Sequence, residues 1–220
     1  MSESKILTII GMGDGISMAI ARRFGQEDFT IAMVSRSNDK LDRIQKKLHR
    51  DGIEAYYYLA DASQKEELTK SINYIHESLG PTDVLIYNAA AVSQINLLNA
   101  SDHQLIDDFK VNTIGALNAS QAVVPLMKQK GGGKIFFTGG GLATEPNPQY
   151  GSLGLGKAAL RNLAQSLHQL LQPNNIHVAT VTVNGFVQLS DDRYNPDAIA
   201  EQYWTLYQQN KGNQEVEISY

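Results

Sequence analysis

The chain has 220 residues, of which 42% are apolar and 19% charged, with a formal net charge of −4. This length suits one α/β domain with a substantial core, and the absence of a basic block argues against nucleic acid or an anionic membrane as the main partner. Cysteine is absent, which excludes disulfides, thiol nucleophiles and thiolate metal sites. No signal-peptide pattern or membrane-length apolar run is present, so we expect a cytoplasmic protein.

Strand-like and helical patterns alternate along the chain. Short apolar runs predict strands at 5–10, 29–35, 53–59, 83–87, 134–138, 176–183 and 214–219. Amphipathic spacing predicts helices at 16–26, 38–50, 63–79, 101–129, 151–171 and 197–209. Strict alternation implies right-handed crossovers and a parallel sheet covered on both faces. No linker or change of composition marks a boundary, so residues 1–220 are predicted to form a single domain.

The first predicted strand runs directly into Gly11, Gly13 and Gly15, and an amphipathic segment begins at Ile16. Glycines let the backbone turn sharply and approach a pyrophosphate closely, while a helix N-terminus offers free N–H groups to the anion. The order strand, glycine turn, helix therefore predicts a dinucleotide-binding βαβ unit.

Charged residues near the ends of the next strands bear on the choice of cofactor. Arg36 suits the 2′-phosphate of NADP, where NAD enzymes usually carry an acid; the alternative is a solvated arginine before a helix capped by Ser37 or Asn38. Asp14 argues mildly against NADP, because a carboxylate among the glycines repels phosphate. Asp61 is expected to line the ligand crevice or to cap the following helix. We predict NADP and leave NAD open.

Several ordered motifs resemble the short-chain dehydrogenase/reductase family, from about residue 5 to residue 219. The glycine turn matches except that Ser17 stands at the third glycine. Further matches lie at 88–90, 109–112, 133–138 and 184–187. By resemblance, the cofactor-binding residues are Gly11, Gly13, Gly15, Ile16, Ser17, Arg36, Asp61, Ala62, Asn88, Ala89, Lys157, Gly185 and Val187.

The resemblance implies an α/β fold, a single-domain Rossmann-type three-layer sandwich with a seven-stranded parallel sheet. It also implies reversible hydride transfer between NAD(P)(H) and an alcohol or carbonyl compound. In this family a tyrosine protonates the carbonyl oxygen, a lysine four residues later lowers that tyrosine's pKa and binds the ribose, and a serine binds the oxyanion. Members pair through the helix corresponding to 151–171 and the helix before it, so a homodimer or homotetramer is expected.

The catalytic motif departs from the family pattern. Lys157 has the usual setting of the family's lysine, but Leu153 stands at the tyrosine position and Gly140 at the serine position. Asn112, the expected helix-borne asparagine, and Lys157 remain. General acid–base catalysis supplies about 10²–10⁴ in rate and one oxyanion donor about 10²–10³. By the standard mechanism the chain is predicted to be a poor enzyme.

Tyr150 is a candidate substitute donor. It follows Asn147 and Pro148, which we interpret as a helix cap and a first helical residue, and it would lie one turn before the tyrosine position. The alternative is a tyrosine packed near the helix start. Glycines at 154 and 156 in the helix interior cost about 1 kcal/mol each relative to alanine, which indicates close approach by the cofactor or a partner helix.

Two hypotheses follow. The first is an NADP-linked oxidoreductase with a degenerate site that uses Lys157 and Asn112, with Tyr150 or an ordered water as proton donor. The second is a non-catalytic dinucleotide-binding protein, a redox sensor or an assembly partner. A shortened substrate lid is predicted near 186–196. The five histidines have no metal-ligand spacing and are assigned surface or incidental roles. Aromatic residues at 203, 204 and 207 are interpreted as core or subunit-interface packing.

Overall fold

A computed structural model describes residues 4–220 and contains one seven-stranded, fully parallel sheet. The strand order is β3-β2-β1-β4-β5-β6-β7. The strands are β1 (Lys5–Ile10), β2 (Phe29–Ser35), β3 (Ala55–Leu59), β4 (Val84–Tyr87), β5 (Gly133–Gly140), β6 (Ile176–Val183) and β7 (Glu217–Ser219). The order reverses between β1 and β4, and open α/β sheets place their ligand crevice at such a point, beyond the carboxyl ends of the strands. The predicted fold class is confirmed.

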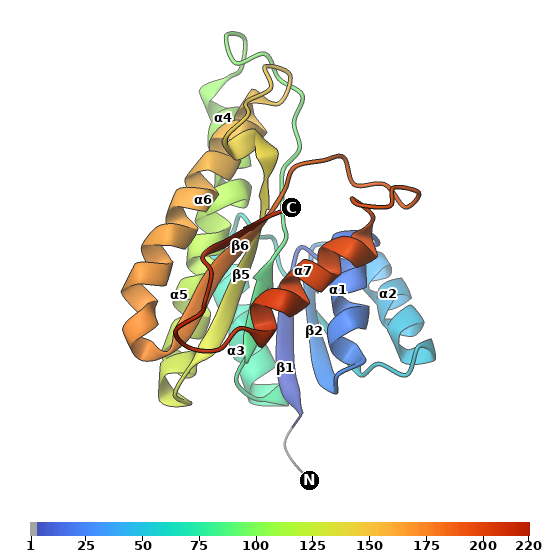
Figure 1. The fold of residues 1–220 in the computed structure, drawn as a ribbon. Helices are drawn as coiled ribbons and strands as arrows, with labels where there is room; N and C mark the ends of the chain where they lie inside the picture. The colour runs from blue at the N-terminus through green and yellow to red at the C-terminus, as the bar shows by residue number, and fades with distance from the viewer. Residues whose placement is uncertain (1–3) are drawn as a thin grey trace.

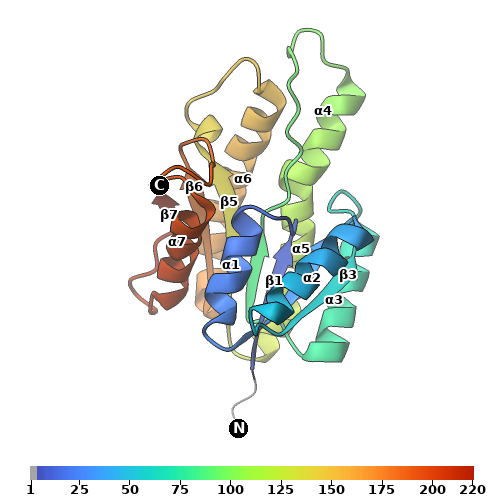
Figure 2. The same ribbon diagram turned by 90° about the vertical axis from the view of Figure 1, so that its right-hand side faces the viewer.

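Helices cover both faces of the sheet, which gives three layers (Figures 1 and 2). One face carries α1 (Ile16–Gly25), α2 (Asn38–Arg50) and α7 (Pro196–Gln208). The other carries α3 (Lys65–Leu79), α5 (Gly115–Gln129) and α6 (Gly151–Leu171), with α4 (Asp102–Phe109) at the end of the α5 layer. The central strands are apolar along most of their length because both of their faces are buried, whereas the edge strands β3 and β7 are partly exposed.

Strand β1 shows how the sequence builds two cores. Leu7 and Ile9 pack with α1, α2 and α7, whereas Ile6 and Ile10 pack on the opposite face with α3, α5 and α6. The aromatic residues of α7 belong to the first core: the Trp204 ring lies edge-on to Phe24 of α1, with centroids 5.1 Å apart. Of the two interpretations for these aromatic residues, core packing is therefore confirmed.

The predicted helix at 101–129 is divided in the structure. Between α4 and α5 runs a π-helical segment, Lys110–Ile114, and a single turn of 3-10 helix, Gly141–Ala143, follows β5. The π-helical segment is short and lies between two helical stretches. The spacing of apolar residues alone therefore predicts one continuous helix. None of the helices in residues 4–220 combines the length and the apolarity needed to cross a membrane.

Candidate cofactor crevice and reacting end

A cavity of about 490 Å³ opens at the carboxyl ends of β1, β2 and β4, where the strand order reverses. The predicted cofactor residues in its lining are Gly11, Gly13, Gly15, Ile16, Ser17, Arg36, Asp61, Ala62, Asn88, Ala89 and Val187. Lys157 and Gly185 were also predicted but are not part of this lining. Gly185 instead lies in the loop before α7, where an added Cβ would come within 2.3 Å of the Tyr194 ring. Lys40 also lines the crevice, although the sequence did not single it out.

The glycine turn brings backbone against backbone. Gly11 has φ +86°, and a Cβ at this position would lie 2.3 Å from the backbone nitrogen of Ala89, so only glycine fits. Ser17, at the third glycine position, closes the turn: its Oγ accepts from Gly13 N–H at 2.8 Å and lies 3.2 Å from the Gly13 carbonyl oxygen, to which it donates. Within residues 4–220, no side chain caps the N-terminus of α1. The turn therefore leaves N–H groups available to an anion.

Arg36 and Asp61 face each other across the adenosine side of the crevice. The Arg36 guanidinium lies 3.5 Å from the Asp61 carboxylate, and the arginine side chain is 75% exposed. Asp61 also accepts from Ser63 N–H at 2.8 Å. Although partial burial acts to raise the pKa of Asp61, the Ser63 N–H and the Arg36 charge together hold it below its usual range. Helix α3 begins only at Lys65, so Asp61 stabilises a local turn rather than capping that helix.

Lys40 adds a second cation to this side. Ser37 caps α2 by accepting from Lys40 N–H, as one of the predicted alternatives had it. The Lys40 ammonium lies 3.1 Å from the place where a Cβ of Gly13 would be, so it reaches the glycine turn itself. The signal in the sequence was the spacing of lysine and arginine at 40, 43 and 47 along the predicted helix, which places three cations on one face.

Asn88 joins the ends of three strands. Its Nδ2 donates to the Gly11 carbonyl at 3.2 Å, and its Oδ1 accepts from the Thr138 hydroxyl at 2.8 Å. Thr138 Oγ1 also lies 2.6 Å from the hydroxyl of Tyr203, which is fully buried on α7. Because the Thr138 proton is used on Asn88, the Tyr203 hydroxyl acts as donor in this pair. The chain of contacts fixes β1, β4 and β5 relative to one another beside the crevice.

Asn112 lies in the π-helical segment and is 1% exposed. Its side-chain amide makes both hydrogen bonds with the backbone of Ala91, accepting from N–H at 2.8 Å and donating to the carbonyl at 3.1 Å. Gly156 of α6 packs directly on it, since a Cβ there would lie 2.5 Å from Asn112 Cβ. The glycine at 156 thus allows two helices to approach, which was one of the two predicted reasons for it.

Lys157 lies beside the empty serine position. The side chain is 8% exposed, and its Nζ donates to the Thr138 carbonyl at 2.6 Å. A Cβ added to Gly140 would meet the methylene groups of Lys157 at 3.7–3.8 Å, an ordinary contact distance. Burial lowers the pKa of Lys157 to about 8, because the charged form loses hydration. A readily deprotonated ammonium group therefore lies next to Gly140, which the sequence predicts at the family's serine position.

Tyr150 is positioned differently from the expectation. It is the residue before α6 and has non-helical dihedral angles, so the interpretation of Asn147 and Pro148 as cap and first helical residue is wrong. The Asn147 side chain instead accepts from Gln149 N–H in a local turn, which competes with capping. The Tyr150 hydroxyl accepts from Gln94 Nε2 at 2.7 Å, in the loop before α4. Its role as proton donor stays a prediction.

Three further predictions concern a metal site, the histidines and the loop before α7. Among residues 4–220, no group of three His, Cys, Asp or Glu side chains could hold a metal ion. His177 is fully buried in β6, so of its two predicted roles, surface or incidental, the surface one is wrong. The loop before α7 contains no helix, and Asp191 in it accepts from the backbone N–H groups of Arg193 and Tyr194 in a local turn.

Comparison with known proteins decides the family. The model of the short chain dehydrogenase family matches residues 5–191. The chain belongs to this family of oxidoreductases. Two curated relatives are each 29% identical: dehydrogenase/reductase SDR family member 4 from Sus scrofa, over 180 residues, and 2,3-dihydro-2,3-dihydroxybenzoate dehydrogenase from Bacillus subtilis, over 181 residues. These alignments cover 80% and 82% of this chain, but 63% and 69% of the relatives, so the chain spans less than two thirds of the pig protein.

Solved structures agree with the fold over almost the whole chain. A short-chain dehydrogenase from Rhodopseudomonas palustris is 28% identical, with a TM-score of 0.88 and coverage of 98% of this chain and 97% of that one. An alcohol dehydrogenase from Thermococcus sibiricus, solved in complex with 5-hydroxy-NADP, is 24% identical, with a TM-score of 0.86 and coverage of 97% and 94%. At that identity the second likeness concerns the fold alone.

Proposed function

We propose that the chain binds NADP(H) and catalyses reversible hydride transfer between this cofactor and an alcohol or carbonyl compound. The observation that carries the proposal is the crevice at the switch of strand order, which the glycine turn lines. Lys157 is buried outside this lining, against Gly140 of β5. Family membership supports the reaction class.

The residues present fit a dinucleotide. The backbone at Gly11 has the close approach that a pyrophosphate needs, and the uncapped N-terminus of α1 offers N–H donors to it. Arg36 and Lys40 both line the crevice on the side of β2, where a dinucleotide places its adenosine ribose. Two cations at this place suit a 2′-phosphate better than a free hydroxyl.

Beside Gly140, we propose that Lys157 donates the proton to the substrate oxygen. A bound nicotinamide would supply or accept the hydride. The Lys157 ammonium uses one proton on the Thr138 carbonyl and has two left for a substrate oxygen beside Gly140. A pKa of about 8 keeps it mostly charged at pH 7 yet able to give up its proton. Reduction should therefore slow as pH rises through about 8.

The proposal is tested by binding and turnover together. NADPH affinity is measured by fluorescence, and NADPH oxidation is followed with a panel of aldehydes and ketones. Lys157→Met should abolish turnover, whereas Tyr150→Phe, which removes only the contact with Gln94, should leave most of it. The opposite result would make Tyr150 the donor. Tight NADPH binding without turnover of any compound would instead support the non-catalytic alternative, which the missing hydroxyl groups at 140 and 153 favour.

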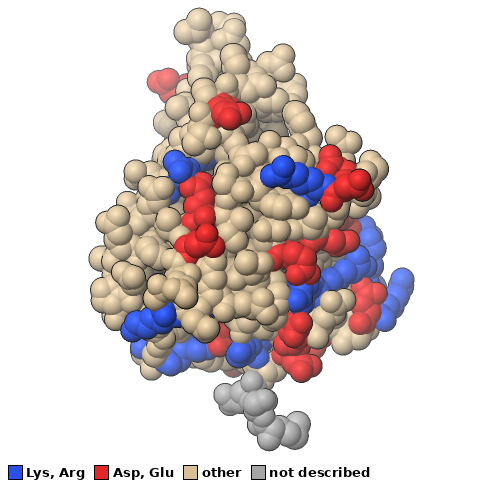
Figure 3. Space-filling model, in the orientation of Figure 1, with Lys and Arg blue, Asp and Glu red and all other residues tan. Residues whose placement is uncertain are grey.

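The loops around the reacting end favour an uncharged, apolar substrate. The loops before α4 and α6 contain no lysine or arginine, and the upper end of the molecule, where they project, shows no basic residue in Figure 3. Val92, Leu98, Phe186 and Leu189 are 65%, 93%, 78% and 88% exposed. Such side chains would contact an apolar carbonyl compound and have no charge to offer a carboxylate. A panel ordered by size and charge should show highest kcat/KM for uncharged, apolar members.

We also propose a homodimer formed through the helical layer of α4 and α6. An apolar hollow of about 390 Å³ lies between these helices and includes Ile106, Phe109 and Leu155. These side chains are 55%, 37% and 55% exposed. The family resemblance names the same helix as a subunit contact, so a second copy is the expected occupant. Light scattering after size exclusion should give the dimer mass, and Leu155→Arg should shift it to the monomer mass.

A further inference from the structure

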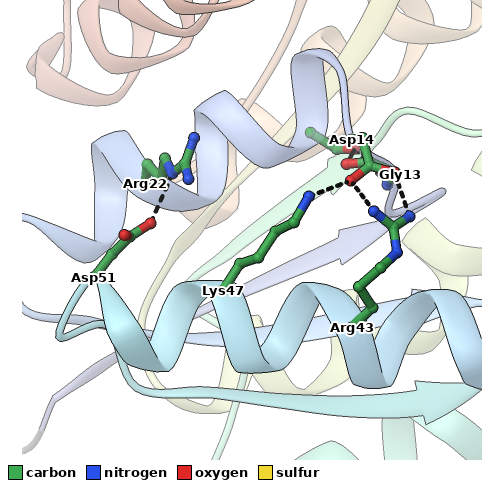
Figure 4. A network of polar contacts seen from close by, with 7 residues as sticks. Gly13, Asp14, Arg22, Arg43, Lys47 and Asp51 are labelled. Atoms are coloured by element: carbon green, nitrogen blue, oxygen red, sulfur yellow. Dashed lines mark hydrogen bonds and ion pairs between the residues drawn. The ribbon is translucent and has the colours of Figure 1, made fainter.

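An acidic residue lies at the edge of the phosphate-binding crevice, and the structure shows what happens to its charge. Asp14 lines the crevice between Gly13 and Gly15. Its carboxylate points to α2, where Arg43 binds it through both guanidinium nitrogens, at 3.0 and 2.6 Å (Figure 4). Lys47 adds a third contact at 3.2 Å. The Arg43 guanidinium holds the pKa of Asp14 below its usual range, so the carboxylate stays ionised at neutral pH.

Charged residues of both signs line this edge of the crevice. The lining carries two acids, Asp14 and Asp61, and two bases, Arg36 and Lys40. Arg43 and Lys47 lie just behind the lining and bring two further positive charges. On the face shown in Figure 3, lysines and arginines gather along the flank that α2 occupies in Figure 1. Arg43 and Lys47 thus offset Asp14, and Arg36 lies beside Asp61, which leaves the Lys40 ammonium at the glycine turn to meet a phosphate.

We infer that Arg43, held by Asp14, is a specificity-determining residue that lets this crevice accept a 2′-phosphorylated dinucleotide despite an acid in its glycine turn. The inference rests on the proposed NADP binding and explains how Asp14, which argued against NADP in the sequence, is compatible with it. Arg43 neutralises the carboxylate that would repel the phosphate, and its guanidinium is held against Asp14 in the glycine turn. The acid, the arginine and Lys40 converge because 40, 43 and 47 share one face of α2.

A second ion pair between the same parts of the chain provides a matched control. Arg22 of α1 binds Asp51, the residue that follows α2, at 2.9 Å, and Figure 4 shows it beyond Lys47, at the end of α2 away from the glycine turn. Like the Arg43–Asp14 pair, it is partly exposed and joins α1 to the α2 region. If the Arg43 pair only fastened two segments together, both pairs would have the same effect on cofactor choice.

The experiment measures dissociation constants of NADPH and NADH, and of the fragments 2′,5′-ADP and 5′-AMP, by calorimetry at low salt. Arg43→Gln should weaken NADPH about fivefold or more relative to NADH, because a bare carboxylate then faces the 2′-phosphate. Asp14→Asn should strengthen NADPH binding relative to NADH. In the double variant, Asp14→Asn with Arg43→Gln, the ratio of the two dissociation constants should return close to the wild-type value. The fragments should show the same changes, and Arg22→Gln should leave every ratio unchanged.

The outcomes separate this inference from the proposed function. If the wild type binds neither dinucleotide, the proposed function fails and the inference fails with it. If the wild type prefers NADPH but Arg43→Gln leaves the ratio within twofold, only the role of Arg43 is refuted. Equal changes in Arg43→Gln and Arg22→Gln, or no recovery in the double variant, refute it as well. Thermal unfolding of every variant shows whether a change in binding reflects lost folding.

Discussion

Replacing Lys157 by methionine should make the protein more stable at neutral pH while it harms the site. Burial holds the pKa of Lys157 at about 8, against 10.5 for an exposed lysine. A difference of this size corresponds to roughly 3 kcal/mol of unfavourable charge burial at pH 7. Methionine keeps most of the packing but leaves the Thr138 carbonyl without its 2.6 Å donor, a loss of about 1 kcal/mol. We expect a net gain of about 2 kcal/mol in the free energy of unfolding.

The difference in the free energy of unfolding between the wild type and Lys157→Met should depend on pH. Because the folded-state pKa lies below the unfolded-state value, the unfolded chain binds more protons between pH 8 and pH 10.5. Wild-type stability therefore gains from Lys157 as pH rises through this window, and the advantage of Lys157→Met should disappear above it. Urea unfolding of both proteins at pH 7 and pH 10.5 measures the difference. Lys134, whose pKa burial also lowers to about 8, is present in both proteins and cancels from the difference.

A variant that is less stable than the wild type at pH 7, or a stability difference that does not change with pH, would refute this reasoning. Lys157→Met should also abolish turnover of the carbonyl panel, because no ammonium group is left to give a proton to the substrate oxygen. A stabilising substitution that abolishes turnover is typical of a group retained for function rather than for folding.

Three further predictions concern the reacting end, the glycine turn and the core. Gly140→Ser combined with Leu153→Tyr restores the family's hydroxyl groups and should raise NADPH oxidation with a carbonyl panel by about 10² or more. Gly11→Ala should abolish dinucleotide binding in calorimetry and lower the melting temperature, because its Cβ would lie 2.3 Å from Ala89 N and its φ is +86°. The pKa of His177 is lowered to about 4 by burial, so wild-type stability should fall as pH drops from about 6.5 to about 4, whereas His177→Phe should show a smaller fall in urea unfolding.

Each of these predictions has a contrary outcome. An unchanged rate in the double variant, with NADPH still bound, would place the loss of chemistry elsewhere than at 140 and 153. Normal NADPH binding by Gly11→Ala would mean that the turn relaxes without touching the crevice. Parallel pH profiles for the wild type and His177→Phe would show that the buried imidazole, whose Nδ1 has no hydrogen-bond partner within residues 4–220, does not titrate on unfolding as argued.

The sequence predicted every strand and most helix boundaries, because β-branched runs and amphipathic spacing are local signals. It could not predict contacts between distant segments. The partners of Asp14, 29 and 33 residues away, depend on how α2 packs beside α1. The hydroxyl of Tyr203 reaches Thr138 across 65 residues, and nothing near Tyr203 in the sequence signals that contact. The bounds predicted for α6 are those of the structure, but its cap was misjudged, because Asn147 accepts from Gln149 N–H in a local turn that looks the same as a cap in sequence.

The glycine turn and the region of Lys157 keep the family pattern to different degrees, and this difference bears on the function of the protein. At the dinucleotide end, contacts compensate for two unusual residues. Ser17, at the third glycine position, closes the turn by accepting from Gly13 N–H. Arg43 neutralises the charge of Asp14. At the reacting end, Gly140 and Leu153 have no compensating hydroxyl in contact with Lys157 among residues 4–220, where the Lys157 side chain donates only to a backbone carbonyl. The contacts of Asp14 with Arg43 and Lys47 therefore suit the proposed dinucleotide binding. The reacting end fits either chemistry that needs an ammonium group alone or binding without turnover.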